Sequence, residues 1–325
     1  MVAPGKGILA ADESMGTIEK RFVKINVPST EDNRRAYREL LFTTKGAGDF
    51  ISGVILFDET VRQKAADGRT FVEALNSQEI LPGIKVDMGT GGMADSPEEK
   101  ITKGLDGLPE RLAEYVELGA KFAKWRAVIT IGEGLPTKEN IVQNARDLAR
   151  YAKLCQDAGL VPIVEPEVLM DGGHDIGRCA EATFQTLNAV FAALRDEGVE
   201  LPGMILKPNM VIPGKESGKK ASPREVAEAT LKTFQKVIPP EMPGIVFLSG
   251  GQSEAEATAN LNEMNKMGKQ PWELSFSYGR ALQDSVLKTW LGKPENVPAA
   301  QAAFLKRAKL NGLARSGKYD ASMEN

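Results

Sequence analysis

The stretch GMILKPNM, residues 203–210, is a short apolar run that ends on Lys207 and Pro208. A run of this length and composition is typical of a strand buried on both faces, as in a parallel sheet. Lysine is among the residues least often found fully buried. An amine at the end of such a strand therefore suggests a reactive group that the sheet presents at its edge.

Seven other apolar runs repeat this pattern, and the segments between the runs carry helical periodicity. The eight runs are GILAA (7–11), SGVILF (52–57), GIKV (83–86), FAKWRAVITI (122–131), VPIV (161–164), GMIL (203–206), GIVFL (244–248) and ELSFS (273–277). Eight strands that each lead into a helix predict an α/β fold of the (β/α)8, or TIM barrel, type. An open doubly wound sheet is the main alternative, but no G-x-G-x-x-G fingerprint follows the first run. No linker divides the chain, so residues 1–325 are expected to form one domain.

Capping signals indicate where several helices begin and end. The stretch PERLAEYVELGAKF (109–122) repeats apolar residues at helical spacing and reaches a glycine at Gly119. Thr137 is a capping residue in front of a second periodic segment. Ser222 followed by Pro223 is typical of a third helix start, because proline suits the first helical position.

The composition argues against several classes of function. The formal net charge of −3 gives no electrostatic case for nucleic acid. No apolar stretch approaches the roughly 18–20 residues that a membrane span needs, and the first residues lack a signal-peptide layout. Cys155 and Cys179, the only cysteines, lie in helix-like segments, which favours a reduced cytoplasmic protein.

The single histidine, His174, limits the catalytic mechanisms that the chain can support. A catalytic zinc site usually draws on several His or Cys ligands, and a Ser-His-Asp triad would depend on His174 alone. This residue sits in the polar, glycine-rich stretch DGGHD (171–175), where a solvated loop histidine is the simpler interpretation. We therefore expect no metal and no cofactor, and we expect carboxylates, lysines or tyrosines to perform any acid–base chemistry.

Ionisable and hydroxyl residues gather where the predicted strands end, which is where barrel enzymes carry their active sites. Residues two apart on a strand point to the same side, so pairs such as Glu165 and Glu167 are expected to enter the barrel mouth together. The residues at these ends are Asp12, Asp58, Glu59, Lys85, Asp87, Lys124, Arg126, Glu165, Glu167, Lys207, Ser249, Ser277, Tyr278 and Arg280.

The alternative for this cluster is a set of salt bridges that close the barrel. Buried ion pairs of this kind cost about as much in desolvation as they return in attraction. The sequence therefore favours a function for Lys207, Lys124, Glu165 and Asp12. For Asp58 and Glu59 both interpretations stay open.

The lysines suggest a particular chemistry. An amine is a nucleophile only in its neutral form, and the reference pKa of lysine is about 10.4. A nearby ammonium and partial burial both disfavour the charged form. Lys207 beside Lys124 or Lys85 would then attack a ketone and form an iminium, an electron sink that lets an adjacent carbon–carbon bond break. Lys207 is therefore a candidate Schiff-base lysine.

Two glycine-containing stretches suggest that the substrate carries phosphate. FLSGGQSEAEA (247–257) leaves the seventh run through glycines, and FSYGRALQ (276–283) leaves the eighth run through Gly279 and Arg280. Glycines at a helix start let backbone N–H groups and the helix dipole meet an anion, and barrel enzymes often hold phosphate after these two strands. Lys20 and Arg21 are candidates for a second anion site, with a solvated helix face as the alternative.

Seven motifs together resemble those of class I fructose-1,6-bisphosphate aldolases, in that family's order and across almost the whole chain. They are GILAADES (7–14), GIKVD (83–87), FAKWR (122–126), VPIVEPE (161–167), LKPNM (206–210), FLSGGQS (247–253) and SYGRALQ (277–283). The resemblance implies reversible, metal-independent cleavage of fructose 1,6-bisphosphate into dihydroxyacetone phosphate and glyceraldehyde 3-phosphate, in glycolysis or gluconeogenesis. It also implies a cytoplasmic homotetramer.

The same resemblance implies a role for each matched catalytic residue. Lys207 matches the Schiff-base lysine, Glu165 the general acid/base of iminium formation, and Glu167 a neighbour that helps to set charge. Asp12 matches the carboxylate that deprotonates the C4 hydroxyl during cleavage. Lys124 and Lys85 match lysines that hold substrate and favour the neutral form of Lys207.

The binding residues are implied in the same way. Ser249, Gly250 and Arg280 match binders of one phosphate, and Lys20, Arg21 and Ser14 match binders at the other end. Further substrate contacts are expected from Arg126, Gly251, Ser277 and Gly279.

Three features depart from the family pattern. The family's VDKG reads VDMG, with Met88 in place of lysine. Relatives usually carry an extra helix before the segment that opens this sequence, so that helix is expected to be absent. The final residues GKYDASMEN (317–325) stand in place of a longer tail that ends in tyrosine. Bacterial members look similar at this end, which favours a bacterial-type enzyme.

Two other functions fit less well. A related Schiff-base aldolase would act on tagatose bisphosphate or fructose 1-phosphate, and relative rates on these sugars separate it from the first interpretation. A non-catalytic phosphosugar-binding scaffold would be expected to have lost part of the lysine–carboxylate set, which is intact in this sequence.

Overall fold

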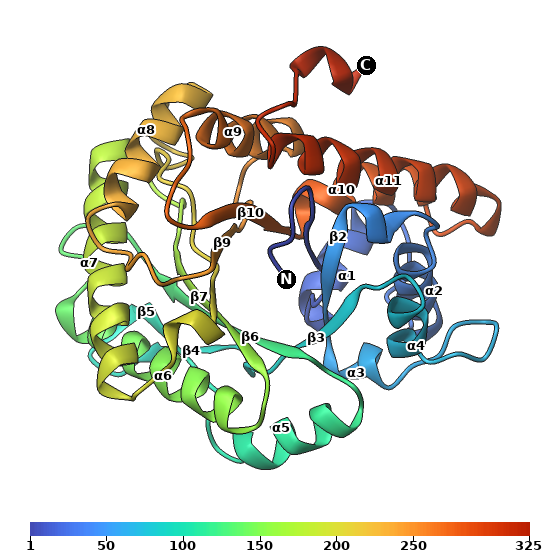
Figure 1. Cartoon of the computed structure of the whole chain (residues 1–325), viewed down its shortest axis with the longest axis horizontal. Coiled ribbons are helices and arrows are strands. Elements are labelled where there is room, and N and C mark those ends of the chain that lie inside the picture. The colour runs from blue at the N-terminus through green and yellow to red at the C-terminus, as the bar shows by residue number, and fades with distance from the viewer.

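The computed structural model describes all residues from 1 to 325, which form a closed barrel of parallel strands with helices around it (Figure 1). Around the barrel the strands follow the order β1–β10–β9–β8–β7–β6–β3–β2. Their bounds are β1 Gly7–Ala10, β2 Ile51–Leu56, β3 Leu81–Lys85, β6 Phe122–Ile129, β7 Val161–Val168, β8 Ile205–Leu206, β9 Gly244–Phe247 and β10 Glu273–Tyr278. Each predicted apolar run overlaps one of these strands, so the predicted (β/α)8 barrel is confirmed.

The helices lie outside the strands and begin largely where the capping signals indicated. Their bounds are α1 Met15–Val23, α2 Glu31–Phe42, α3 Asp58–Val61, α4 Phe71–Asn76, α5 Leu108–Glu117, α6 Lys138–Asp157, α7 Ile176–Asp196, α8 Pro223–Phe234, α9 Glu254–Lys266, α10 Arg280–Trp290 and α11 Val297–Ala314. Before α6, Thr137 accepts a hydrogen bond from the N–H of Asn140. Before α8, Ser222 and Glu225 form a reciprocal capping box. Both caps satisfy N–H groups that have no partner within the helix.

One connection departs from the predicted alternation of strand and helix. Between β3 and α5 the chain forms an antiparallel hairpin of β4 (Thr90–Met93) and β5 (Ser96–Thr102). The expectation that every strand leads directly into a helix is therefore wrong at β3. The hairpin is mostly exposed, so its sequence carries none of the apolar periodicity by which the barrel strands were predicted.

A buried carboxylate ties this hairpin to the barrel. Glu99 on β5 is fully buried and accepts hydrogen bonds from the Thr137 N–H, at 2.8 Å, and the Thr137 hydroxyl, at 2.6 Å. Thr102 donates to the carbonyl oxygen of Arg126 on β6, at 2.8 Å. The hairpin is thus fixed to both β6 and the start of α6.

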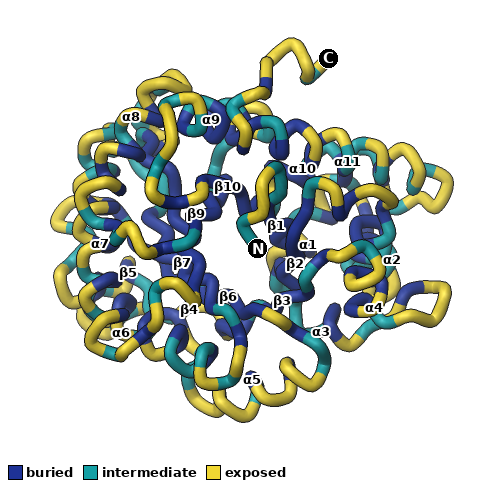
Figure 2. Tube along the Cα trace, viewed as in Figure 1, coloured by how far each residue is buried: buried dark blue, intermediate teal, exposed yellow.

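The interior of the barrel is filled by apolar side chains, and Figure 2 shows the strands as buried. Phe122 on β6 packs within a cluster formed by Ile8, Ala10, Ile55, Phe122, Ile163, Ile205 and Val246. A Cβ atom on Gly83 would lie 2.2 Å from the Phe122 ring, and one on Gly53 would lie 3.0 Å from it. Glycine at these two positions therefore makes the room that the aromatic ring fills.

The segment before β1 covers the amino-terminal end of the barrel, as the position of the N label in Figure 1 shows. Met1 and Val2 pack against the inner apolar cluster. Arg315 holds the segment in place by donating from Nε to the carbonyl oxygen of Ala3, at 3.0 Å, and from Nη1 to that of Leu274, at 3.0 Å. Only the opposite end, where the strands terminate, is left for a pocket.

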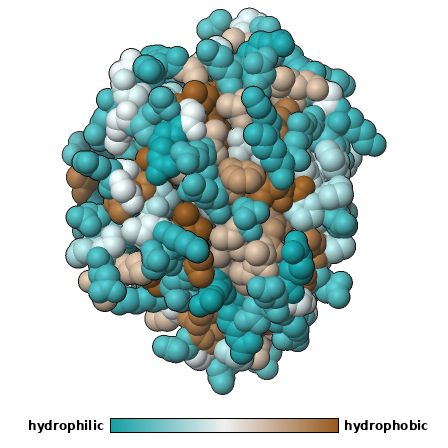
Figure 3. Space-filling view, turned by 90° about the vertical axis from the view of Figure 1, so that its left-hand side faces the viewer, coloured by the Kyte–Doolittle hydropathy of each residue, from teal (hydrophilic) through white to brown (hydrophobic).

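The outer surface is mixed in character. On the face beside α7, Figure 3 shows hydrophilic residues over most of the area, with apolar side chains in small groups between them. None of the helices combines the length and the apolar character needed to cross a membrane.

Replacing Gly83 by alanine should destabilise the barrel. The added methyl group would overlap Phe122, and overpacking of this kind typically costs about 1–3 kcal/mol. Gly16→Ala in α1 is the control, because its Cβ would meet no atom within 4 Å and alanine favours helix by about 0.5–1 kcal/mol. Urea denaturation at 25 °C measures both changes. Equal stability of Gly83→Ala and the parent protein would contradict the role given to Phe122.

Candidate active site

A pocket of about 1040 Å³ opens at the carboxyl ends of the barrel strands. Its walls contain side chains that lie on or just after all eight barrel strands: Asp12 after β1, Asp58 after β2, Lys85 on β3, Lys124 on β6, Glu165 on β7, Lys207 after β8, Ser249 after β9 and Ser277 on β10. The structure thus brings together at one place most of the reactive residues that the sequence placed at strand ends. Glu59 and Tyr278 are the exceptions: neither lines the pocket, and the buried Tyr278 hydroxyl donates to the carbonyl oxygen of Ala257, at 3.0 Å.

Alternation along the strands explains why charged side chains meet above an apolar layer. Phe122 and Lys124 are two apart on β6, and Ile163 and Glu165 are two apart on β7. Residues two apart point to the same side of a strand. Because Phe122 and Ile163 belong to the inner apolar cluster, Lys124 and Glu165 point into the barrel one step higher.

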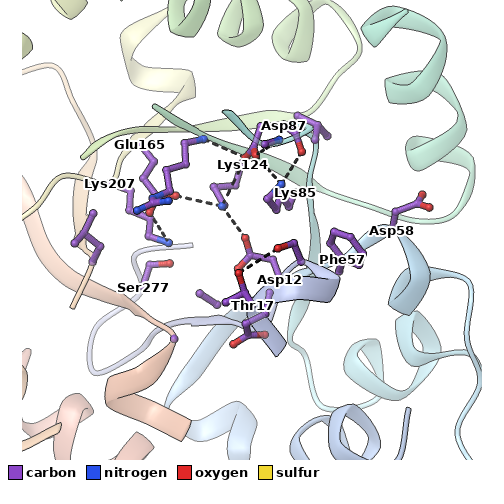
Figure 4. A pocket seen from close by; sticks show the side chains of 18 of the residues that line it. Asp12, Thr17, Phe57, Asp58, Lys85, Asp87, Lys124, Glu165, Lys207 and Ser277 are labelled. Carbon is purple, nitrogen blue, oxygen red and sulfur yellow. Dashed lines mark hydrogen bonds and ion pairs between the residues drawn. The ribbon is translucent and has the colours of Figure 1, made fainter. Parts of the chain in front are cut away.

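Glu165 lies between two lysines, as Figure 4 shows. Its Oε1 is 3.2 Å from the Nζ atom of Lys207, and its Oε2 is 3.3 Å from the Nζ atom of Lys124. Lys124 also pairs with Asp12, at 2.6 Å. At most 9% of any of these four residues is exposed. The sequence predicted either Lys124 or Lys85 as the neighbour of Lys207, and the structure shows that a shared carboxylate bridges Lys207 and Lys124.

The charges of this group follow from its contacts. Burial alone would lower the pKa of Lys124, but the carboxylates of Asp12, Glu165 and Asp87 raise the pKa above its ordinary value. Burial alone would raise the pKa of Asp12, but the positive charges of Lys124, Lys207 and Lys85 hold it well below its ordinary value. Lys124 is therefore a stable cation and Asp12 a stable anion at neutral pH.

Lys85 is held by a different carboxylate. Its Nζ atom lies 2.6 Å from Oδ1 of Asp87 and donates to the Asp87 carbonyl oxygen, also at 2.6 Å. Asp87 accepts a hydrogen bond from the backbone N–H of Arg126, at 3.3 Å, and the Arg126 side chain pairs with Glu167. Asp87 thus joins β3 to β6 beside the central lysines.

Asp58 and Glu59, for which the sequence allowed both a function and a salt bridge, form ion pairs with arginines. Asp58 pairs with Arg62, at 2.9 Å, and accepts a hydrogen bond from the Tyr115 hydroxyl, at 2.9 Å. Glu59 accepts from Nε of Arg34, at 2.8 Å. Figure 4 places Asp58 away from the central lysines. These contacts favour the salt-bridge interpretation for both residues.

The loops after β9 and β10 border the pocket as the sequence predicted. Ser249, Gly250, Gly279 and Arg280 line it, together with Ser277, whose buried hydroxyl has no hydrogen-bond partner within the protein. The helix α10 begins after Gly279 without a side-chain cap, so its first N–H groups are free to meet an anion.

Gly251 is the one predicted binding residue that does not line the pocket. Its backbone is in the left-handed region, with φ of +69°, and a Cβ atom there would lie 1.7 Å from the sulfur of Met170. The structure thus shows Gly251 shaping the turn after β9 rather than facing the pocket.

The residues predicted for a second anion site lie along α1, with Ser14 just before its first residue and Lys20 and Arg21 in its last turn. Ser14, Lys20 and Arg21 line the pocket. Arg21 pairs with Glu13, and its Nη2 atom would lie 3.5 Å from a Cβ atom on Gly279. Arg21 of this group therefore lies beside Gly279 of the other group, where β1 meets β10.

Glu13 and Thr17 also line the pocket, although neither was predicted to do so. Glu13 directly follows Asp12, and strand alternation would turn it away from the barrel. The chain has left β1 by this point, so alternation no longer applies. Thr17 lies 3.1 Å from Ser14 through their hydroxyl oxygens. Its position one turn after Ser14 on α1 is the signal that would have identified it.

No group of three or more His, Cys, Asp or Glu side chains is arranged to hold a metal ion. His174 does not line the pocket.

Comparison with known proteins shows a match to one family along the whole length of this chain. The family model described as "Fructose-bisphosphate aldolase class-I" matches residues 1–325. A cytosolic fructose-bisphosphate aldolase of Arabidopsis thaliana is 58% identical over 97% of this chain and 81% of its own length. A probable class 1 aldolase of Xanthomonas axonopodis is 55% identical over 98% of this chain and 96% of its own length.

A solved structure is also similar over nearly the whole chain. It is a complex of fructose-bisphosphate aldolase from Plasmodium falciparum with TRAP and a small-molecule inhibitor. It has a TM-score of 0.97, with 54% sequence identity over 98% of this chain and 93% of that chain. The relationship suggested by the seven motifs is confirmed.

Replacing Asp12 by asparagine should make the fold less sensitive to acid. Since the pKa of Asp12 is lower in the folded protein than its ordinary value of 3.8, the ionised side chain stabilises the fold above about pH 4. That stabilisation is lost as the pH falls below about 4, so the free energy of unfolding should decline less steeply between about pH 5 and 3 in Asp12→Asn. Urea denaturation across this range measures the slope, with the exposed Asp95→Asn as control. Parallel slopes for Asp12→Asn and the parent protein would contradict the ion pair with Lys124.

Proposed function

Since the chain belongs to the class I fructose-bisphosphate aldolase family, we propose that it cleaves its substrate through a Schiff base on Lys207. The enzyme is a carbon–carbon lyase that converts fructose 1,6-bisphosphate reversibly into dihydroxyacetone phosphate and glyceraldehyde 3-phosphate. The observation that carries the assignment of Lys207 is its burial at the end of β8, 3.2 Å from a carboxylate that it shares with the cation Lys124.

The first half of the reaction makes the electron sink. The neutral amine of Lys207 adds to the ketone carbon C2, and the resulting carbinolamine loses water to become an iminium. Glu165 lies next to the amine and supplies the proton that departs with the hydroxyl group. Lys124 stabilises the carboxylate form of Glu165 between proton transfers, because it holds the other oxygen.

The second half breaks the bond between C3 and C4. Asp12 accepts the proton of the C4 hydroxyl, the electrons of the C3–C4 bond move to the iminium, and the aldehyde leaves. The low pKa of Asp12 keeps this residue ionised and ready to accept the proton. Protonation of the enamine at C3 and hydrolysis of the iminium then release dihydroxyacetone phosphate and restore Lys207.

Two anion sites hold the ends of the substrate in this proposal. Ser249, Gly250, Ser277 and the start of α10 at Gly279 and Arg280 form one site, where the unpartnered Ser277 hydroxyl and free N–H groups suit a phosphate. Ser14, Lys20 and Arg21 contribute to the second site. Lys85, Arg126 and Glu167 then flank the sugar chain between them.

The setting of the enzyme is proposed from the family. We infer a single-domain, cytoplasmic homotetramer that works in glycolysis and gluconeogenesis without a metal ion, and the cytosolic relative from Arabidopsis thaliana supports the location. Relative rates on fructose 1,6-bisphosphate, fructose 1-phosphate and tagatose bisphosphate test the substrate preference.

Borohydride reduction in the presence of dihydroxyacetone phosphate should attach the substrate covalently to Lys207. Reduction turns the transient iminium into a stable amine, and peptide mass mapping locates the modified lysine. Lys207→Arg should abolish labelling, whereas Lys215→Arg, at a side chain that is 45% exposed, should not. A label on Lys124 or Lys85, or loss of activity in EDTA, would overturn the assignment.

Asp12→Asn and Glu165→Gln should block different steps. Glu165→Gln should slow iminium formation by the roughly 10²–10⁴-fold typical of a lost general acid/base. Asp12→Asn should still be trapped by borohydride at a rate near that of the parent enzyme but should fail to cleave the C3–C4 bond. Single-turnover trapping and aldehyde release, measured separately, distinguish the two steps. If Asp12→Asn cannot be trapped, the proposed division between these carboxylates is wrong.

A further inference from the structure

We propose that Arg38, which lies behind the pocket and does not line it, is a positioning residue that keeps Arg21 available for a substrate phosphate. The inference rests on the proposed function, in which Arg21 belongs to an anion site. Arg38 projects from α2 and is only 3% exposed, so it cannot touch the substrate itself.

Glu13 links the two arginines. Its carboxylate pairs with Arg21 through Oε1 and lies 2.6 Å from Nη2 of Arg38 through Oε2. The Arg38 contact lacks the alignment of a hydrogen bond, since Oε2 has no hydrogen-bond partner. Arg38 therefore acts on Glu13 mainly through its charge.

The charge balance of Glu13, Arg21 and Arg38 explains why a second arginine is needed. Glu13 and Arg21 alone would form a neutral pair, which attracts an anion only weakly. With Arg38 the three side chains carry one net positive charge, and the two arginines share the attraction of one carboxylate. The positive charges of both arginines also outweigh burial and lower the pKa of Glu13, so the carboxylate stays ionised.

Other contacts fix the side chain of Glu13 in the pocket wall. Gln283 on α10 donates from Nε2 to Oε1 of Glu13, at 3.0 Å, and to the carbonyl oxygen of Ala10, at 2.8 Å. The hydroxyl group of Tyr37 donates to the Gln283 side chain, at 2.9 Å, and sets the orientation of its amide. Glu13 is thus an anchored carboxylate at which Arg21 is held near Gly279.

Loss of the Arg38 charge should therefore leave Arg21 as the only cation paired with Glu13, so that its attraction for the phosphate weakens. Arg38→Gln is expected to raise the KM for fructose 1,6-bisphosphate about tenfold, the size typical of coupling between neighbouring residues. The inhibition constant of inorganic phosphate should rise by a similar factor. The kcat and the rate of borohydride trapping should stay within about twofold, because the lysine–carboxylate cluster is unchanged.

A double-mutant cycle with Arg21→Ala tests whether Arg38 acts through Arg21. Arg21→Ala should itself raise KM, and Arg38→Gln should have no further effect on KM in the Arg21→Ala background. Arg38→Lys should restore most of the affinity, because it keeps the charge. Arg35→Gln is the matched control, since Arg35 lies on the same helix and pairs with Glu39 on its outer side.

A double variant with the same net charge as the parent enzyme tests the inference if Arg38→Gln folds poorly. Glu13→Gln/Arg38→Gln removes one charge of each sign and leaves no buried carboxylate unpaired, so the net charge of the three side chains returns to that of the parent enzyme. Its KM should lie close to the parent value, and a KM raised about tenfold in this double variant would contradict the inference.

Each other outcome overturns the inference. Independent, multiplying effects of Arg21→Ala and Arg38→Gln would mean that Arg38 does not act through Arg21, and a fall in kcat with unchanged KM would indicate only structural damage. If Arg21→Ala raises KM while folded Arg38 variants do not, the inference alone fails. If Arg21→Ala leaves KM unchanged, the phosphate role proposed for Arg21 fails together with the inference.

Discussion

Two buried amines must share one carboxylate in this barrel, and the arrangement of the site follows from that requirement. An unpaired ammonium ion is costly to bury, so Lys124 and Lys207 each take one oxygen of Glu165. Neighbouring strands lie about 4.8 Å apart, and β6, β7 and β8 are consecutive in the barrel. Side chains from these three strands can therefore meet without distortion of the backbone.

Asp12 makes this arrangement asymmetric. It pairs with Lys124 from the opposite side of the barrel mouth and keeps that lysine charged. Lys207 forms an ion pair with Glu165 alone. Lys124 thus stays charged, whereas Lys207 has a single partner, Glu165, that can exchange a proton with it. The apolar layer around Phe122 lies directly beneath and keeps these interactions strong by excluding water.

The barrel and the central site were predictable because both depend on local pattern. Apolar runs marked the strands, and alternation identified which side chains would enter the mouth together. The hairpin of β4 and β5 was not predictable in the same way, since its exposed strands bury little apolar surface. Glu13 was missed for a different reason: its partners Arg21, Arg38 and Gln283 come from three helices, and no spacing rule in one sequence connects such positions. Gly251 was misplaced because a glycine in a binding loop can shape the turn instead of meeting the ligand.

The hairpin of β4 and β5 is attached to the barrel by the hydrogen bonds of Glu99 and Thr102, and its strands are not part of the closed barrel. Met88, Gly89 and Thr90, where the hairpin begins, nevertheless border the pocket. Chain length at its tip can therefore change during evolution without shifting the register of any barrel strand. The same property makes the tip a natural place to graft new recognition elements beside an unaltered catalytic centre.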